Sequence, residues 1–92
     1  MDIEKLKIVK SDERGIIYDC EKMNFLIRKK DTISSDHTHF EEEDIFLVEG
    51  KIELTVGNET EKVEAPVKIE VPANIYHKII ALTDIKILYY YK

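Results

Sequence analysis

Hydrophobic and polar residues alternate with a period of two in several short stretches along this chain. The stretches with this alternation, or with a short hydrophobic run in its place, are residues 6–8, 23–28, 45–48, 52–56, 67–71 and 85–91. Successive side chains of a β-strand point to opposite faces, so this period is typical of strands that bury one face. We therefore expect a β-strand in each stretch and an all-β fold.

Turn-forming residues separate these stretches at short intervals. They are Gly15, Glu49 with Gly50, Gly57 with Asn58, Pro66, Pro72 to Asn74, and Thr83 with Asp84. Short strands joined by tight turns favour antiparallel pairing, because parallel strands need long crossover connections that nothing here supplies. We predict a single domain over residues 1–92, built as an antiparallel β-sandwich or β-barrel. The lysine-rich first 12 residues would pair as an outer strand or lie against a partner.

Composition narrows the partners that such a domain could have. The 92 residues are 43% hydrophobic and 36% charged, which is typical of folded globular proteins. The net charge of −5 disfavours a nucleic-acid partner, because phosphate backbones are bound by clustered lysine and arginine. No hydrophobic run reaches the roughly 20 residues of a membrane span, and the first residues do not resemble a signal peptide. We therefore expect a cytoplasmic protein with no membrane partner.

The single cysteine, Cys20, cannot form a disulfide within the chain. A reactive thiolate is usually held by nearby basic groups or histidine, and none lies close to Cys20 in sequence. We interpret Cys20 as a small apolar residue on a strand rather than as a metal ligand or nucleophile.

The three histidines carry the clearest chemical signal. His37 and His39 are separated by one residue, and both follow a turn-like segment at residues 31–36. On an extended strand such a pair shares one face, so we expect the two rings to point the same way. Taken alone, His77 among hydrophobic neighbours is more often a hydrogen-bonded core residue, and the acidic run at residues 41–44 is more often a solvated turn. A site is indicated only when these groups are considered together.

Two segments of the chain resemble the motifs of a known family. The segment from His37 to Gly50 fits the pattern HxHx(3,4)Ex(6)G, which is the first motif of the cupin superfamily. Its second motif, Gx(5)PxGxxHx(3)N, is partly matched through Pro72 and His77. The chain therefore resembles a small cupin, and the resemblance implies a jelly-roll-like antiparallel β-barrel with a metal ion inside it.

The resemblance also implies a ligand set for that metal. The residues at the ligand positions are His37, His39, Glu43 and His77. Motif spacing selects Glu43 from the acidic run, with Glu42 as the alternative. Three imidazoles and one carboxylate suit divalent first-row ions such as those of Fe, Mn, Zn, Ni or Cu. Such a set leaves one or two positions open to water or to a small-molecule substrate.

Four positions depart from the two motifs, and none of them is a ligand position. Asp31 stands where the first motif usually begins with glycine, and three residues replace motif residues of the second, namely Pro66, Asn74 and Ala81. Asparagine tolerates a left-handed backbone, so we expect Asn74 to preserve the turn after Pro72. These departures bear on the subfamily and therefore on the substrate.

Strand parity predicts the surroundings of the site. Ile45 and Leu47 should share the inward face of Glu43, whereas Phe46 and Val48 should face the opposite way. Candidate walls of a substrate pocket are Phe25, Ile27 and Tyr76, for which plain core packing is an equal alternative.

Two further features have a candidate role. Arg28 is a candidate for a charged group that binds a substrate. The closing Tyr89-Tyr90-Tyr91 is interpreted as a final strand with aromatic rings on both faces, and as a dimer contact in second place.

The resemblance suggests three functions from different classes. The first is a metal-dependent enzyme, dioxygenase-like and next isomerase-like, acting on a small molecule. The second is a noncatalytic module that binds a sugar or an organic acid as a sensor. The third, ranked last, is a structural domain with a vestigial histidine cluster. Small cupins resemble proteins that pair through their sheets, so we also expect a homodimer.

Overall fold

The computed structural model describes residues 1–92 and contains ten β-strands and no helix, which confirms the all-β prediction. The strands are β1 (Lys7–Asp12), β2 (Gly15–Asp19), β3 (Asn24–Arg28), β4 (Ile33–His37), β5 (Glu43–Glu49), β6 (Lys51–Val56), β7 (Glu59–Glu64), β8 (Val67–Val71), β9 (His77–Ala81) and β10 (Ile85–Tyr91). With no helix present, none has the length and apolar character of a membrane span.

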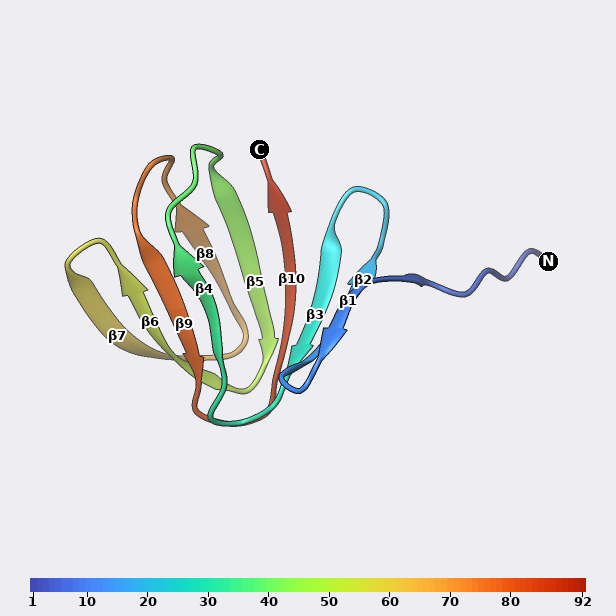
Figure 1. Cartoon of the computed structure of the whole chain (residues 1–92), viewed down its shortest axis with the longest axis horizontal. Helices are drawn as coiled ribbons and strands as arrows, with labels where there is room; N and C mark the ends of the chain where they lie inside the picture. Colours follow the sequence, from blue (N-terminus) through green and yellow to red (C-terminus); the bar gives the residue numbers. More distant parts are fainter.

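The strands form two antiparallel sheets that face each other (Figure 1). One sheet has six strands in the order β1-β2-β3-β10-β5-β8, and the other has four in the order β4-β9-β6-β7. The chain crosses repeatedly between the sheets, for example from β5 to β6 and from β9 to β10. This confirms the jelly roll, although no strand pairing joins the two sheets into a closed barrel. The predicted outer strand near the N-terminus is β1, which pairs with β2 at the edge of the six-stranded sheet.

The hydrophobic core lies between the two sheets. Its 11 buried residues are Ile17, Leu26, Ile45, Leu47, Ile52, Leu54, Val71, Ile79, Ala81, Ile85 and Ile87. In β5 the predicted parity is confirmed, because Ile45 and Leu47 are 1% exposed whereas Val48 is 49% exposed and Phe46 is half-buried. Fully burying each aliphatic side chain of this kind contributes about 1.5–3 kcal/mol, so the facing surfaces fix the orientation of Glu43 on the same strand.

The turns at two departing motif positions keep a left-handed backbone without glycine. Asp31 has φ 68° and Asn74 has φ 61°, which confirms the expectation for the turn after Pro72. The backbone N–H of Asn74 donates a hydrogen bond of 2.9 Å to the backbone carbonyl of His39. This bond connects the turn before His77 to the segment that carries His39, so the replacement residue still brings two candidate ligands together.

Cys20 lies directly after β2 rather than within a strand, and it is half-buried. Its amide donates a hydrogen bond of 2.9 Å to the carbonyl of Met23, which closes the turn to β3. The expected strand position was therefore wrong by one residue, because the turn begins at the cysteine itself.

Candidate metal centre

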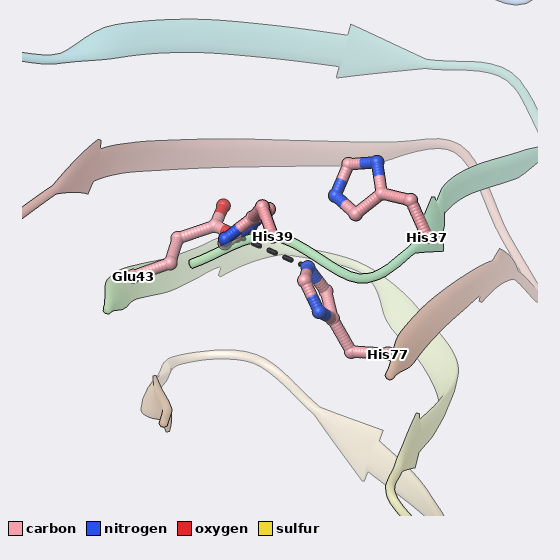
Figure 2. Close-up of side chains that lie close together, drawn as sticks. All are labelled: His37, His39, Glu43 and His77. Carbon is pink, nitrogen blue, oxygen red and sulfur yellow. Dashed lines mark hydrogen bonds and ion pairs between the residues drawn. The ribbon is translucent and has the colours of Figure 1, made fainter. Parts of the chain in front are cut away.

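Four side chains from both sheets converge at one end of the sandwich (Figure 2). His37 ends β4, His39 follows it in a loop, Glu43 begins β5, and His77 begins β9. His37 and His77 are direct partners in the β4–β9 ladder, so strand pairing alone brings these two together. The candidate ligand atoms of all four residues lie within 4.8 Å of one another.

The strand expected to carry both His37 and His39 ends at His37. Residues 33–37 form β4, whereas residues 38 and 39 lie outside any strand. The ladder is also irregular between Ser34 and His37, and Ser35 has φ 56°. The two rings nevertheless face the same centre, with their centroids 4.9 Å apart. The shared direction comes from the loop geometry and not from a continuous strand.

Glu43 is the acidic residue that faces the histidines. Its side chain is 4% exposed, and its Oε1 lies 3.1 Å from Nε2 of His39 and 3.2 Å from Nε2 of His77. Glu42 is exposed and is not among the four converging residues. Asp44 is also buried, but it faces the other side of the sheet and pairs with Lys68 and Lys92. A solvated turn, which this acidic run would favour if taken alone, is therefore not what its last two residues form, and Glu43 is the residue that motif spacing selected.

Backbone carbonyls fix which nitrogen faces the centre in two of the three rings, those of His39 and His77. The Nδ1 of His39 lies 2.9 Å from the carbonyl of Glu41, and the Nδ1 of His77 lies 3.2 Å from the carbonyl of Ile75. A carbonyl only accepts, so each Nδ1 carries a proton, and each Nε2 is directed toward the Glu43 carboxylate, where it can bind a metal ion when the ring is neutral. Metal-binding histidines are held in this way, with the second nitrogen donating to a backbone oxygen.

One of the converging nitrogen atoms lacks a hydrogen-bond partner, whereas Nε2 of His39 is paired with Oε1 of Glu43 at 3.1 Å. The Nε2 of His77 is buried and has no hydrogen-bond partner, since its approach to Glu43 lacks the angle of a hydrogen bond. Leaving a buried polar atom unpaired costs about 1–3 kcal/mol. A divalent cation placed among the nitrogen and carboxylate atoms would satisfy all of them at once. The residues present therefore fit a metal ion.

Burial and neighbouring charges shift the pKa values of the histidines in different directions. Burial lowers the pKa of His37, and the two neighbouring imidazoles lower it further. Burial alone would also lower the pKa of His77, but Glu43 and the Ile75 carbonyl outweigh it, so the net pKa is raised. Glu43 thus favours a positive charge at the centre, whether it is a proton or a metal ion.

A cavity of about 190 Å³ opens beside the cluster, between the sheets. His37 and Glu43 form part of its wall, together with Leu26 and Arg28 of β3. The predicted wall residues Phe25, Ile27 and Tyr76 do not line it, and that expectation was wrong. Every residue from 23 to 27 except Asn24 is hydrophobic, so the pattern of β3 could not fix its parity, and the inward face is the one that carries Arg28.

The closing tyrosines contribute to the site more than expected. The ring of Tyr91 packs edge-on against His39 with centroids 5.0 Å apart, and Tyr89 lines the cavity. Burial, followed by the charge of Glu43, raises the pKa of Tyr91 to about 12. Tyr90 faces outward and donates a 2.5 Å hydrogen bond to Asp44, so aromatic rings occupy both faces as predicted. Period two from the inward Ile87 was the available signal for the inward tyrosines.

The two glutamates of the acidic run give a matched pair of variants. We expect Glu43→Gln to weaken metal binding by about tenfold or more, because the amide keeps the volume but removes the anionic ligand. Glu42→Gln removes the same charge from an exposed side chain and should leave metal binding unchanged. Titration with Zn²⁺ against a competing chelator measures both. Equal loss in the two variants would show that net charge and not ligation governs binding.

Comparisons with known proteins show where this fold recurs. A family model described as "Cupin domain" matches residues 24–90. Among solved structures, an RmlC-like cupin from Shewanella frigidimarina has a TM-score of 0.71 at 17% identity, over 75% of this chain and 62% of that one. The capsular polysaccharide assembling protein CapF from Staphylococcus aureus has a TM-score of 0.83 at 18% identity, over 97% of this chain and 28% of that one. No curated protein sequence matches the chain.

A third similar structure is an enzyme. A mutant of salicylate 1,2-dioxygenase from Pseudoaminobacter salicylatoxidans has a TM-score of 0.70 at 16% identity, over 82% of this chain and 21% of that one. The chain thus spans 62% of the Shewanella protein and less than a third of the other two. At identities of 16–18% these comparisons establish a shared fold. They do not assign the activities of these proteins to this chain.

Proposed function

This chain belongs to the cupin domain family, and from that premise we propose that it binds a divalent metal ion and acts through it on a small molecule. The observation that carries the proposal is the convergence of three imidazoles and one buried carboxylate within 4.8 Å, with an unsatisfied nitrogen among them. In the proposed site His37, His39 and His77 each give one ring nitrogen, and Glu43 gives one oxygen. The ion would be one of Fe, Mn, Zn, Ni or Cu.

Such an ion supplies Lewis acidity, which polarises a bidentate oxygen ligand or lowers the pKa of bound water. The residues of the chain would do the rest of the work. Hydrophobic side chains on the cavity wall, among them Leu26 and Ile45, keep bulk water away from a bound ligand. Tyr91 packs against His39 and holds that ring in place. The cavity volume of about 190 Å³ suits a small ligand.

Among reactions, oxygen-dependent cleavage or oxidation is our first choice, and isomerisation of a sugar or keto acid is the second. The choice rests on analogy, because a salicylate 1,2-dioxygenase is among the proteins of similar fold. No carboxylate, imidazole or thiol outside the cluster lines the cavity. Apart from the two arginines, the titratable side chains that remain on its wall are Lys10, Tyr89 and Tyr91, so a proton transfer beside the metal centre would fall to one of these three groups.

The same observation favours a second candidate function. A cavity beside a metal ion, with no carboxylate, imidazole or thiol on its wall outside the cluster, is also suited to holding a small molecule without converting it, as a sensor or binding module does. Both candidate functions predict that a small molecule binds in the cavity. Only the enzyme is expected to convert it to a product. The homodimer and the cytoplasmic location remain predictions from the sequence.

The proposal is tested by removing metal and restoring one ion at a time. We expect restoration to raise the Tm by about 10 °C or more, since a ligand at 100 times its Kd stabilises by about 2.7 kcal/mol and each kcal/mol shifts a small domain by about 4–8 °C. Each metal form is then given diketones, keto acids and sugars while oxygen consumption and Tm are followed. Turnover supports the enzyme, and a ligand-induced shift without turnover supports the binding module. An unchanged Tm together with no stoichiometric metal would contradict both.

A further inference from the structure

Arg28 is a buried arginine without an acidic partner. Its side chain lies on the inward face of β3, is 3% exposed, and lines the cavity beside the cluster. Its Nε donates to Oγ of Ser34 at 3.2 Å, and its Nη1 lies 3.5 Å from the carbonyl of Ile27. No aspartate or glutamate forms an ion pair with it. Buried charges are normally paired, because an unpaired one costs several kcal/mol.

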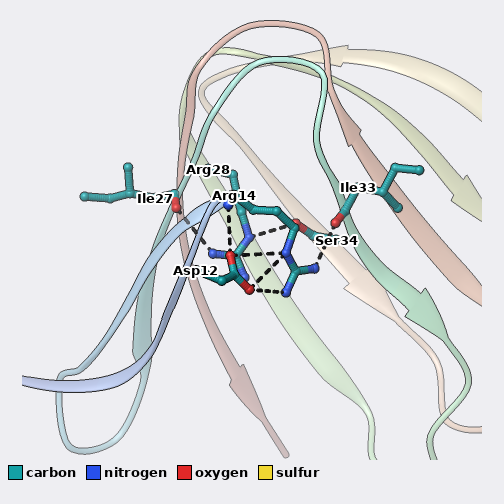
Figure 3. A network of polar contacts seen from close by, with 6 residues as sticks. All are labelled: Asp12, Arg14, Ile27, Arg28, Ile33 and Ser34. Carbon is teal, nitrogen blue, oxygen red and sulfur yellow. Dashed lines mark hydrogen bonds and ion pairs between the residues drawn. The ribbon is translucent and has the colours of Figure 1, made fainter.

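The one acidic side chain in this network is already committed to another arginine (Figure 3). Both carboxylate oxygens of Asp12 accept hydrogen bonds from Arg14, the shortest at 2.8 Å from Nη2, and the Arg14 amide donates to Oδ1 at 2.9 Å. These hydrogen bonds lower the pKa of Asp12 to about 2. The remaining terminal nitrogen of Arg14, Nη1, donates a hydrogen bond to the carbonyl of Ile33. Asp12 therefore neutralises Arg14 and leaves the charge of Arg28 unmatched.

The cavity is positive although the chain is acidic. Its wall carries Lys10, Arg14 and Arg28 against the single carboxylate of Glu43, whereas the whole chain has a net charge of −5. With Arg14 neutralised by Asp12, one positive charge remains in excess, and a divalent ion at the cluster would add two more. A recessed positive site in a low-dielectric wall attracts small anions.

We propose that Arg28 binds the carboxylate of the ligand in this cavity, so that the protein acts on a small organic acid rather than on a neutral sugar. The inference rests on the proposed function, since the other oxygens of the acid would face the metal centre. A guanidinium presents paired N–H donors whose geometry matches a carboxylate. Ser34 holds the Nε and leaves terminal nitrogens for the ligand. A neutral sugar would leave the buried charge unpaired.

The test compares acids with their neutral amides in protein stripped of metal. Pyruvate and glycolate are titrated against pyruvamide and glycolamide, and ligand-observed NMR follows binding at millimolar concentration. Metal-free protein is essential, because a bound ion would itself attract the carboxylate. We expect wild type to bind each acid at least tenfold more tightly than its amide. Zn²⁺-loaded protein and inorganic phosphate form two further arms.

The variants isolate the guanidinium. Arg28→Gln should lose at least tenfold in affinity for the acids with no change for the amides, and Arg28→Lys should recover part of it because a point charge replaces the fork. The control is Lys86→Gln, which removes one positive charge from an exposed residue of β10 that does not line the cavity. Its affinity for the acids should equal that of wild type.

Stability and metal content separate a ligand-binding role from a structural one. Arg28→Met keeps the length of the apolar stem and removes the unpaired charge, so its Tm should equal or exceed that of wild type. A structural arginine would instead lower the Tm when replaced. Metal content should be the same in wild type and in the Arg28 variants, since Arg28 is not part of the cluster.

Each outcome bears on one proposal. The inference is overturned if metal-free wild type does not prefer acids over amides, if Arg28→Gln keeps that preference, or if phosphate binds tenfold more tightly than the acids in an Arg28-dependent way. If the acids bind through Arg28 but no metal binds at the cluster, the assignment of Arg28 stands and the proposed metal function fails. If metal binds and the preference is missing, only the inference on Arg28 fails.

Discussion

His77→Ala is expected to retain less than about a tenth of the wild-type metal content after dialysis against a weak chelator. His77 begins β9 directly opposite His37, its side chain is 0% exposed, and its Nε2 is the unsatisfied atom of the cluster. Losing one of the proposed ligands should cost more than losing a hydrogen-bond partner of a ligand, which already weakens metal sites by about 10- to 100-fold. Elemental analysis of purified protein measures the content.

The same variant should still fold. Truncating His77 leaves a small cavity, but it also removes a buried nitrogen that has no partner, so we expect a loss of only about 1–3 kcal/mol in the metal-free protein. The control is Lys78→Ala, at the next position of β9, where the side chain points to the opposite face. The control should keep its metal. Equal metal content in wild type, His77→Ala and Lys78→Ala would remove His77 from the proposed ligand set.

Gly50→Ala is expected to destabilise the fold by about 2–4 kcal/mol, which would lower the Tm by at least about 8 °C. Gly50 joins β5 to β6 where the chain crosses between the sheets, and it has φ 99°. A Cβ at this position would lie 2.4 Å from the carbonyl oxygen of Asp84 and 2.7 Å from Oγ1 of Thr83. Both atoms belong to the β9–β10 connection, so the two crossovers would be pushed apart.

Gly57→Ala separates this clash from the cost of backbone conformation. Gly57 also has a left-handed backbone, with φ 61°, but its added Cβ would meet only Cγ2 of Ile75, at 3.7 Å. Its expected cost is therefore the conformational penalty alone, about 1 kcal/mol. Thermal and urea unfolding of the two variants give the comparison. Similar losses in both would mean that the crossovers of the sandwich can move apart without cost.

The strands that were predictable are those whose two faces differ. In β10 the inward positions hold Ile85 and Ile87, and the period of two located that strand, whereas β5 was located by the four-residue hydrophobic run that starts at Ile45. β7 was missed because its sequence, ETEKVE, is exposed at five of six positions and lies at the edge of its sheet. β2 was missed because Ile16, Ile17 and Tyr18 form a run without alternation. Pairing with neighbours, which is not written in either segment, makes them strands.

The cluster was predictable from motif spacing, and its chemistry was not. Spacing named His37, His39, Glu43 and His77, and the structure brings these four together. Sequence could not say that the carbonyls of Glu41 and Ile75 orient two of the rings, since these contacts depend on the fold of the loops. Nor could it say that His39 lies beyond the end of its strand.

For Arg28, the sequence predicted a candidate role, and the tertiary structure determined where the side chain lies. An arginine in an alternating strand is expected to face water, and the sequence alone allowed only a candidate role. The parity of β3 was decided by how the strand packs, because Leu26 enters the core while Phe25 and Ile27 do not. Arg28 is two residues from Leu26 on the same strand, so it shares the inward face and is buried despite the free-energy cost of burying its charge.

The alternation of side chains and the spacing of the ligands were fixed by the chain itself, because both are local properties of neighbouring residues. The tertiary structure decided which face of each strand is buried, which carboxylate is free, and where a cavity opens. These depend on the competition of distant groups for the same space and the same partners. Asp12 forms hydrogen bonds with Arg14 and leaves Arg28 without an acidic partner. This outcome depends on where the folded chain places the three side chains, so the sequence could not predict it.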